Sequence, residues 1–240
     1  MSHPDTASPS PRVSVVLMAF NEAASLATVT GEIHAELMQL GAGFELLIID
    51  DGSTDGTGKI ADNLATTMAG VRVCHHGVNR GLGAVYRTGF AEARGEWVTF
   101  FPADGQFPAT IIGLYLATAD DTDLILGTLP DRGGPVMARI LSMAERLLLR
   151  ALFGHFPRFQ GIMMFRRSLL DGTELVSQGR GWTVIMEFIL RLARAGARIK
   201  NLPITIRPRR DGASKVTNLR SITSNLRQVL ALRLKLPRAQ

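Results

Sequence analysis

The chain has 240 residues, of which 46% are hydrophobic and 20% charged, and its formal net charge at pH 7 is +6. This is the profile of one globular α/β domain with at most a small appendage. A single cysteine excludes an internal disulfide, and a content of 6% aromatic residues without a recognition motif argues against a nucleic-acid-binding protein.

The start of the chain is expected to lie outside the domain. Residues 1–12 are rich in Ser, Pro and Thr and lack an apolar core, which predicts a disordered tail rather than a signal peptide. No stretch reaches the roughly 18 uncharged apolar residues that a membrane span needs. Cys74 lies in an apolar run, which favours a buried strand thiol and a reducing, cytoplasmic compartment.

The first half alternates short apolar runs with amphipathic stretches, the pattern of βαβ units around a mostly parallel sheet. Strands are predicted at 13–18, 44–49, 71–74, 96–101 and 124–127. Helices are predicted at 23–40, 57–68, 108–118, and from the glycine-rich segment 79–83 through 93.

The second half is less regular. Helices are predicted at 135–153 and 183–195, a strand at 199–206 with Pro203 at a sheet edge, and a basic amphipathic helical segment at 216–240. Residues 13–215 would then form the main domain. From Arg132 onward acidic residues are few, and the excess of Arg and Lys suits an anionic partner or is simply a solvated basic surface.

Two acidic loops follow predicted strands. Asp50 and Asp51 come directly after the second strand, and Asp104 comes after the fourth, about fifty residues later. The carboxyl ends of parallel strands border the crevice where open α/β sheets bind ligands. The first loop is therefore predicted to hold a nucleotide and the second a metal-bound diphosphate. The alternative is that both are ordinary turns, since Asp, Gly and Ser are common turn residues.

The second loop has the composition of a metal site. Asp104 and Gln106 are two residues apart in an extended loop, so the carboxylate and the amide oxygen point the same way. Mg²⁺ or Mn²⁺ takes oxygen ligands and is usually completed by substrate phosphates. Such an ion would neutralise a nucleoside diphosphate leaving from a sugar.

An ordered set of motifs spans nearly the whole chain. The motifs are VVLMAFNE at 15–22, DDGSTDGT at 50–57, NRGLG at 79–83, ADGQF at 103–107, FRR at 165–167, and Arg209 with GASK at 212–215. In this order they resemble the family-2 glycosyltransferases of the GT-A fold, within them the dolichyl-phosphate mannose synthase and polyprenyl-phosphate glycosyltransferase branch. The resemblance implies a Rossmann-like α/β domain with a mostly parallel central sheet and flanking helices.

The resemblance also implies roles for individual residues. The base and ribose would be held near the first loop, and Asp104, Arg209 and Lys215 would form the catalytic set around the phosphates. The predicted sugar-nucleotide site comprises Phe20, Glu22, Ile49, Asp50, Asp51, Ala103, Asp104 and Arg132. Arg209 offers a fork matched to phosphate oxygens and Lys215 a movable charge, unless their segment is a solvated charged loop.

The chain departs from the family pattern at three places. Met18 stands where Pro is usual, and Gln160–Gly161 stands where Ser-Gly is usual. Pro102 replaces the first Asp of an Asp-x-Asp motif, which removes one potential metal or sugar contact. A weaker metal site, a different donor sugar or an inactive homologue would each follow from that loss.

The acceptor decides whether a general base is needed. A hydroxyl acceptor needs a base beside it, whereas a lipid phosphate is already an anion. Glu187 is the late carboxylate that fits a base, but it also fits an ion pair with Arg191 at i+4, and the sequence favours neither.

Basic residues on the predicted helix 135–153 suit a phosphate. Arg139, Arg146 and Arg150 fall within about 20° of one line on the helix. Arg139, Arg146 and Ser214 are the predicted acceptor-phosphate ligands. The apolar remainder of this helix, like that of the C-terminal segment, suits either core packing or a bilayer interface.

Together these patterns predict an inverting, metal-dependent glycosyltransferase. It would move a mannose- or glucose-type sugar from a GDP- or UDP-sugar to a polyprenyl phosphate. The enzyme itself would be peripherally attached to the inner face of the membrane. The alternatives are the same fold acting on a hydroxyl acceptor with Glu187 as base, and a nucleotide-binding homologue without catalysis.

Overall fold

The computed structural model describes residues 10–129, 143, 147–154, 156–207 and 219–235, with the side chains of 219–226 excepted. Within these residues one seven-stranded sheet has the order β3-β2-β1-β4-β6-β5-β7. The strands are β1 Val13–Ala19, β2 Phe44–Asp50, β3 Val71–His75, β4 Trp97–Pro102, β5 Leu124–Thr128, β6 Met163–Arg166 and β7 Ile199–Pro203.

The sheet is mostly parallel, as predicted. The pairs β1–β2, β1–β4, β2–β3 and β5–β7 are parallel. β6 runs antiparallel between β4 and β5, and the sequence did not predict it as a strand. Its residues Met163 to Phe165 are buried on both faces, so they show no alternation that would separate them from other apolar runs.

Helices cover both faces of the sheet. They are α1 Leu26–Leu40, α2 Thr57–Thr67, α3 Leu82–Glu92, α4 Ile111–Leu116, α6 Thr183–Arg194 and α7 Leu219–Lys235. The core on one face joins the sheet to α1, α2 and α4, and the core on the other face joins it to α3 and α6. Because both faces are buried, the central strands are continuous apolar runs.

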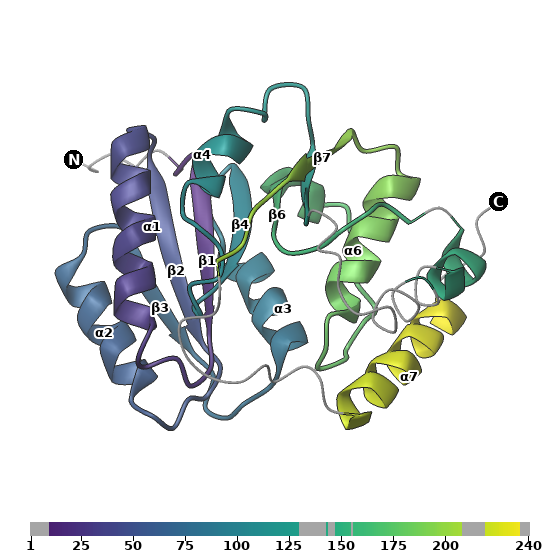
Figure 1. Cartoon of the computed structure of the whole chain (residues 1–240), viewed down its shortest axis with the longest axis horizontal. Helices are drawn as coiled ribbons and strands as arrows, with labels where there is room; N and C mark the ends of the chain where they lie inside the picture. Colours follow the sequence, from purple (N-terminus) through teal and green to yellow (C-terminus); the bar gives the residue numbers. More distant parts are fainter. Residues whose placement is uncertain (1–9, 130–142, 144–146, 155, 208–218, 236–240) are drawn as a thin grey trace, which may run out of the picture.

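A third apolar cluster lies outside the sheet. Residues 147–153 are helical, and Leu149 and Phe153 pack with Met186 of α6 and with Val229 and Leu232 of α7. Figure 1 shows α7 beside α6 at the end of the molecule away from α1 and α2. The predicted helix 135–153 is thus helical in its last turns, and most of the rest lies outside the described residues.

Several predicted boundaries were wrong. α1 begins at Leu26 rather than 23, α4 spans 111–116 rather than 108–118, and β7 ends at Pro203 rather than 206. Before α1, residues 23–25 form a turn, and Asn21 has a φ of +53°. Cys74 lies in β3 as predicted, but it is half-buried rather than buried.

The predicted tail also ends earlier than expected. Residues 1–9 lie outside the described residues, but Arg12 donates its N–H to the carbonyl of Gly43 at 2.7 Å. The carbonyls of Pro11 and Arg12 accept bonds from Glu96 and Trp97. These two residues therefore extend the pairing of β1 with its neighbours.

Candidate functional site

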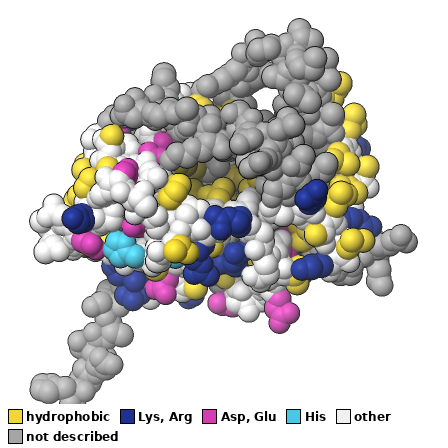
Figure 2. All heavy atoms as spheres, turned by 90° about the horizontal axis from the view of Figure 1, so that it is seen from below, with side chains coloured by type: hydrophobic (Ala, Val, Ile, Leu, Met, Phe, Trp, Pro, Cys, Tyr) yellow, Lys and Arg dark blue, Asp and Glu magenta, His cyan; other side chains and the backbone are white. Residues whose placement is uncertain are grey.

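The strand register brings the two acidic loops together. Ala19 at the end of β1 pairs with Asp50 at the end of β2, and Met18 pairs with Pro102 at the end of β4. The loops after β2 and β4 therefore flank the turn that follows β1. Figure 2 looks onto this edge from below, where acidic side chains and a histidine lie beside several basic side chains.

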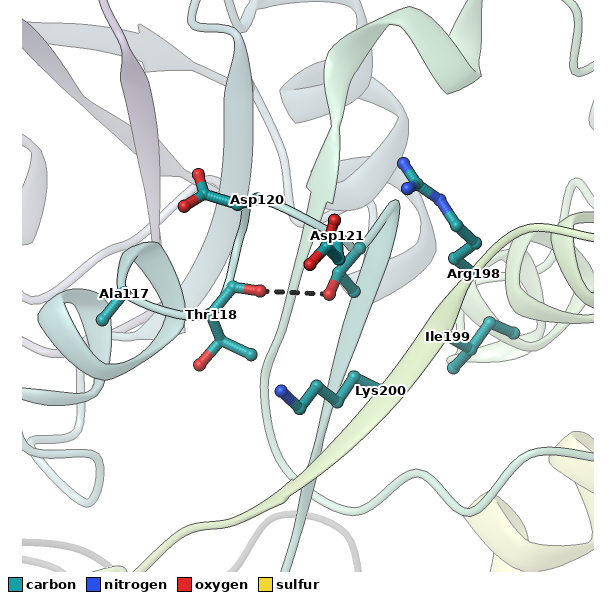
Figure 3. Close-up of a pocket in the computed structure, with 8 residues that line it drawn as sticks. Ala117, Thr118, Asp120, Asp121, Arg198, Ile199 and Lys200 are labelled. Carbon is teal, nitrogen blue, oxygen red and sulfur yellow. Dashed lines mark hydrogen bonds between the residues drawn. The ribbon is translucent and has the colours of Figure 1, made fainter.

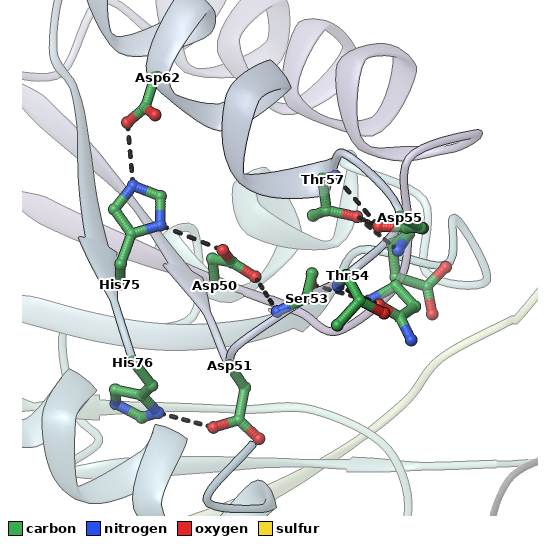
Figure 4. A network of polar contacts seen from close by, with 11 residues as sticks. Asp50, Asp51, Ser53, Thr54, Asp55, Thr57, Asp62, His75 and His76 are labelled. Atoms are coloured by element: carbon green, nitrogen blue, oxygen red, sulfur yellow. Dashed lines mark hydrogen bonds and ion pairs between the residues drawn. The ribbon is translucent and has the colours of Figure 1, made fainter. Parts of the chain in front are cut away.

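Asp50 is held between its own loop and β3. Its side chain is buried, Oδ1 accepts the N–H of Ser53 at 3.0 Å, and Oδ2 lies 3.1 Å from Nδ1 of His75 (Figure 4). Nε2 of His75 lies 2.9 Å from Oδ1 of Asp62. The bond to Asp62 raises the pKa of His75; burial opposes the rise, and Asp50 adds to it. His75 therefore orients Asp50 most firmly when it is protonated.

Asp51 is surrounded by donors from the next loop. Its Oδ1 lies 2.6 Å from Nδ1 of the buried His76 and accepts the N–H of Arg80 at 3.0 Å. Its Oδ2 accepts from Nδ2 of Asn79 at 2.9 Å and from the N–H of Gly81 at 2.8 Å. Each oxygen accepts two bonds, so Asp51 shapes the loop at 79–81.

The loop after β1 is joined to the first acidic loop. The N–H of Asn21 donates to Oγ of Ser53 at 2.9 Å, and Oδ1 of Asn21 accepts the N–H of Thr54 at 2.9 Å. The N–H of Glu22 donates to Oγ1 of Thr57 at 2.8 Å. These bonds place Phe20 and Glu22 beside the loop that carries Asp50.

Asp55 completes this junction. Burial alone would raise its pKa, but the hydroxyl of Thr57 and the N–H groups of Ala23 and Thr57 outweigh that effect and lower the pKa. The ionised carboxylate of Asp55 thus ties the start of α2 to the turn that precedes α1.

The second acidic loop turns tightly at the end of β4. The N–H of Ala103 donates to the carbonyl of Met18 at 3.0 Å, and Gly105 has a φ of +73°. Asp104 is buried, and its Oδ1 accepts the N–H of Gln106 at 3.1 Å. The carbonyl of Gln106 accepts the N–H of Arg207 at 2.7 Å, so the chain after β7 returns to this loop.

The residues at this turn have the oxygen donors that Mg²⁺ or Mn²⁺ prefers, but few of them. Among the described residues, no three His, Cys, Asp or Glu side chains lie close enough to hold a metal ion by themselves. One carboxylate and one amide fit an ion that takes its other oxygens from a diphosphate and water. Pro102, at the end of β4, contributes no ligand.

Glu187 is hydrogen-bonded inside the protein on all the contacts described for it. It is fully buried on α6, and Nε of Arg191 donates to its Oε1 at 2.8 Å. The N–H groups of Val176 and Ser177 donate to its two oxygens at 3.0 and 2.8 Å. The interpretation as an ion pair with Arg191 at i+4 is confirmed, and the role of a general base stays a prediction.

Of the remaining predicted residues, six lie outside the part of the chain that the structure describes and two lie beside the acidic loops. Arg132, Arg139, Arg146, Arg209, Ser214 and Lys215 all lie outside the described residues. Ile49 and Ala103 are buried at the ends of β2 and β4, beside the acidic loops.

Sequence reasoning missed the two histidines at the end of β3. His75 is in register with Asp50, so it and His76 lie next to the acidic pair. Two consecutive histidines at the end of a predicted strand could have indicated a site. Their contact with the acidic pair, however, depends on β3 lying beside β2.

A hollow of about 390 Å³ lies elsewhere, lined by residues 117–118, 120–122 and 198–200 (Figure 3). It sits at the starts of β5 and β7, where Leu124 pairs with Ile199, and so at the opposite edge of the sheet. Arg198 beside it is paired with Asp123. This hollow is not part of the candidate site.

Comparisons with known proteins agree with this geometry. The model of the family "Glycosyl transferase family 2" matches residues 14–173. The chain is 30% identical to the polyprenol monophosphomannose synthase of Mycolicibacterium smegmatis, over 95% of this chain and 87% of that protein. It is also 30% identical to the undecaprenyl-phosphate mannosyltransferase of Micrococcus luteus, over 86% and 88%.

A solved structure supports the fold. The mannosyltransferase PcManGT from Pyrobaculum calidifontis, in complex with GDP-Man and Mn²⁺, superposes with a TM-score of 0.67 at 19% identity, covering 96% of this chain and 66% of that one. The predicted GT-A fold is confirmed by this similarity together with the family match.

Proposed function

Because the chain belongs to glycosyl transferase family 2 and is a glycosyltransferase, we propose that its acceptor is a polyprenyl phosphate and its donor a GDP- or UDP-sugar. The sugar is of the mannose or glucose type. The relatives that are 30% identical bear the names of polyprenol-phosphate and undecaprenyl-phosphate mannosyltransferases, which supports a lipid phosphate acceptor and favours mannose.

The observation that carries the proposal is the burial of Glu187. Because its oxygens are filled by Arg191, Val176 and Ser177, it is not available to deprotonate a hydroxyl acceptor. A phosphate acceptor is already ionised at neutral pH and needs no base. An anionic acceptor therefore fits this chain better than a sugar hydroxyl.

The reaction is a single displacement. An oxygen of the acceptor phosphate attacks the anomeric carbon, and the bond from that carbon to the nucleoside diphosphate breaks, so the leaving oxygen takes the electron pair. Attack from the face opposite the leaving group inverts the configuration. The loops that carry Phe20, Glu22 and Asp50 hold the base and ribose, which positions the anomeric carbon beside the second loop.

Asp104 and Gln106 would hold a divalent metal, Mg²⁺ or Mn²⁺. When bound, such an ion neutralises the charge that develops on the leaving diphosphate. The bond from the N–H of Gln106 to Asp104 fixes the carboxylate on a tight turn, which preorganises it for that contact. Arg209 and Lys215 are proposed as the phosphate-binding cations, and Arg139, Arg146 and Ser214 as the acceptor-phosphate ligands.

A peripheral contact with the inner face of the membrane would bring the lipid to this site. Leu147, Leu148, Leu230 and Leu234 are exposed by 61%, 38%, 43% and 89%. They lie on helical segments whose opposite sides pack on α6, and Arg150, which is exposed, and Arg233, which is half-buried, accompany them. Among the described residues, no helix is long and apolar enough to cross a bilayer, so the proposed contact is interfacial.

A transfer assay tests the proposal. The protein is incubated with polyprenyl phosphate, Mn²⁺ and radiolabelled GDP-mannose, UDP-glucose or other sugar nucleotides in turn. We expect label in the organic phase with one of these donors and loss of that product with EDTA. Label in water-soluble products alone would overturn the lipid acceptor.

Pro102 favours a second candidate, a homologue that binds nucleotide without turnover. It follows from the missing carboxylate at the end of β4. Calorimetry separates the two proposals: tight GDP or UDP binding that ignores Mn²⁺, together with no transfer to any acceptor, would support the second candidate.

A further inference from the structure

The loop at 79–83 is hydrogen-bonded to the segment 179–183, which lies a hundred residues later in the chain. Nη2 of Arg180 donates to the carbonyl oxygen of Asn79 at 2.9 Å and to its Oδ1 at 2.6 Å. The carbonyl of Arg180 accepts the N–H of Gly83 at 2.9 Å. One residue therefore ties down both ends of this loop.

The glycines of the loop allow this close contact. A Cβ on Gly81, whose φ is +85°, would lie 2.8 Å from the carbonyl oxygen of Arg180. A Cβ on Gly83 would overlap the carbonyl oxygen of Gly179. Glycines at 81 and 83 thus allow residues 179–181 to pack against the backbone at the start of α3.

The later segment is itself fixed from two sides. Glu187 of α6 accepts the N–H groups of Val176 and Ser177, as described above. From α7, Oε1 of Gln228 accepts the N–H of Gly181 at 3.3 Å and the hydroxyl of Thr183 at 3.2 Å. The C-terminal helix therefore contacts the backbone that carries Arg180.

The other end of this path is the first acidic loop. Asn79 receives Arg180 on its oxygens and donates through Nδ2 to Asp51. Asp51 follows Asp50 directly at the end of β2. Hydrogen bonds and the backbone that joins Arg180 to Gly181 thus connect α7, through the segment 179–183 and the loop 79–83, to the strand end where the nucleotide is proposed to bind.

We propose that Arg180 and Gln228 are positioning residues of the donor site, which hold the loop 79–83 and through it Asp51 in the conformation that binds the sugar nucleotide. The inference rests on the proposed function for the location of the nucleotide, but it does not depend on the acceptor. Arg180 matters more than Gln228, because it makes two charge-assisted bonds directly to the loop.

Nucleotide binding to full-length variants tests this inference. The variants are Arg180→Ala, Arg180→Lys, Gln228→Ala and the double variant, with Arg227→Ala as the control. Arg227 is exposed beside Gln228 on α7, so the control removes the same charge as Arg180→Ala without touching the segment. Calorimetry with GDP and UDP is combined with donor kinetics and thermal unfolding.

We expect Arg180→Ala to weaken nucleotide binding about tenfold, the size typical of hydrogen bonds from a charged donor. Gln228→Ala should weaken it about threefold, and Arg180→Lys should recover part of the loss. KM for the donor should rise with little change in kcat. Because both residues act through one path, the double variant should bind about as weakly as Arg180→Ala alone.

Three results would overturn the inference. They are unchanged nucleotide affinity in folded Arg180→Ala, an equal loss in Arg227→Ala, or a loss confined to kcat. Failure of the lipid-transfer assay with nucleotide binding altered as expected would instead count against the proposed acceptor and leave this inference standing.

Discussion

Three buried carboxylates at the sheet edge differ in what surrounds their oxygens. Asp51 accepts four hydrogen bonds from the protein, whereas Asp50 shares its oxygens between His75 and Ser53. Asp104 sits on a tight turn that fixes its Oδ1 through the N–H of Gln106. We propose Asp104 as the metal ligand because it lies on the loop after β4, two residues before the amide oxygen of Gln106.

Changing the second loop should change metal affinity. We expect Asp104→Asn to weaken Mn²⁺ binding in the presence of GDP or UDP at least tenfold, because it removes the charge that an oxygen-ligated ion needs. Pro102→Asp should tighten binding by about tenfold, since it adds a second carboxylate at the end of β4. Electron paramagnetic resonance titration of free Mn²⁺ measures both, and Pro102→Ala separates the new carboxylate from the loss of proline. Equal affinities in all four proteins would exclude this loop as the metal site.

His75 should make stability depend on pH. Its pKa is raised above the usual value of 6.5, first by the bond to Asp62 and, against the effect of burial, by Asp50. A raised pKa in the folded state stabilises the protein below the unfolded-state value, and this stabilisation is lost as the pH rises through the folded-state value. Urea unfolding between about pH 5 and 9 should therefore show the wild type losing stability relative to His75→Gln. A constant difference between the two proteins would contradict this assignment.

At the scale of elements, the parallel strands were predictable and β6 was not. β1, β2 and β4 are short apolar runs, and β2 and β4 end in turns rich in Asp and Gly, a combination that favours buried strands. β6 has four residues, and its position depends on antiparallel pairing with β4 and β5, which no local pattern encodes.

The same distinction applies to the candidate site. Asp50, Asp51 and Asp104 were predictable because a strand end is recognisable from its own residues. The contacts of Asp51 with Asn79 and of Asn79 with Arg180 were not, because they join segments whose adjacency follows only from the strand order and from the packing of α3 on α6. The hydrogen bonds of Glu187 with the backbone N–H groups of Val176 and Ser177 could not be predicted either, because no side-chain pattern marks them.

Glu187 should prove more important for stability than for chemistry. Glu187→Ala leaves Arg191 and the N–H groups of Val176 and Ser177 without their acceptor, and breaking a buried ion pair in this way costs about 3–5 kcal/mol. Chemical denaturation measures this loss, and Glu174→Ala, at an exposed site, should change stability by less than about 0.5 kcal/mol. If Glu187→Ala kept full stability but lost turnover, Glu187 would be a catalytic base after all.

At the scale of the whole molecule, two groups of exposed apolar residues differ in their charged neighbours. Leu147, Leu148, Leu230 and Leu234 belong to the helical segments packed against α6, at the end of the molecule that Figure 1 shows with α7. At the other end, Met38 and Leu40 of α1 and Leu114 of α4 are also exposed, but the carboxylate of Glu36 lies beside Leu40 next to Gly113 of α4. Single exposed apolar residues are common, but a group of them with arginines beside them suits an anionic bilayer surface.

This placement predicts which substitutions release the protein from membranes. Leu147→Glu combined with Leu234→Glu should weaken binding to vesicles of phosphatidylglycerol and phosphatidylcholine about tenfold, because two exposed leucines lose their contact with the lipid and gain a like charge toward its headgroups. Met38→Glu is the matched control and should bind like the wild type. Vesicle flotation measures the bound fraction, and added salt should weaken wild-type binding because arginines contribute to it. If Met38→Glu were released as readily as the double variant, or neither were released, the membrane would not be contacted through the helices that surround α6.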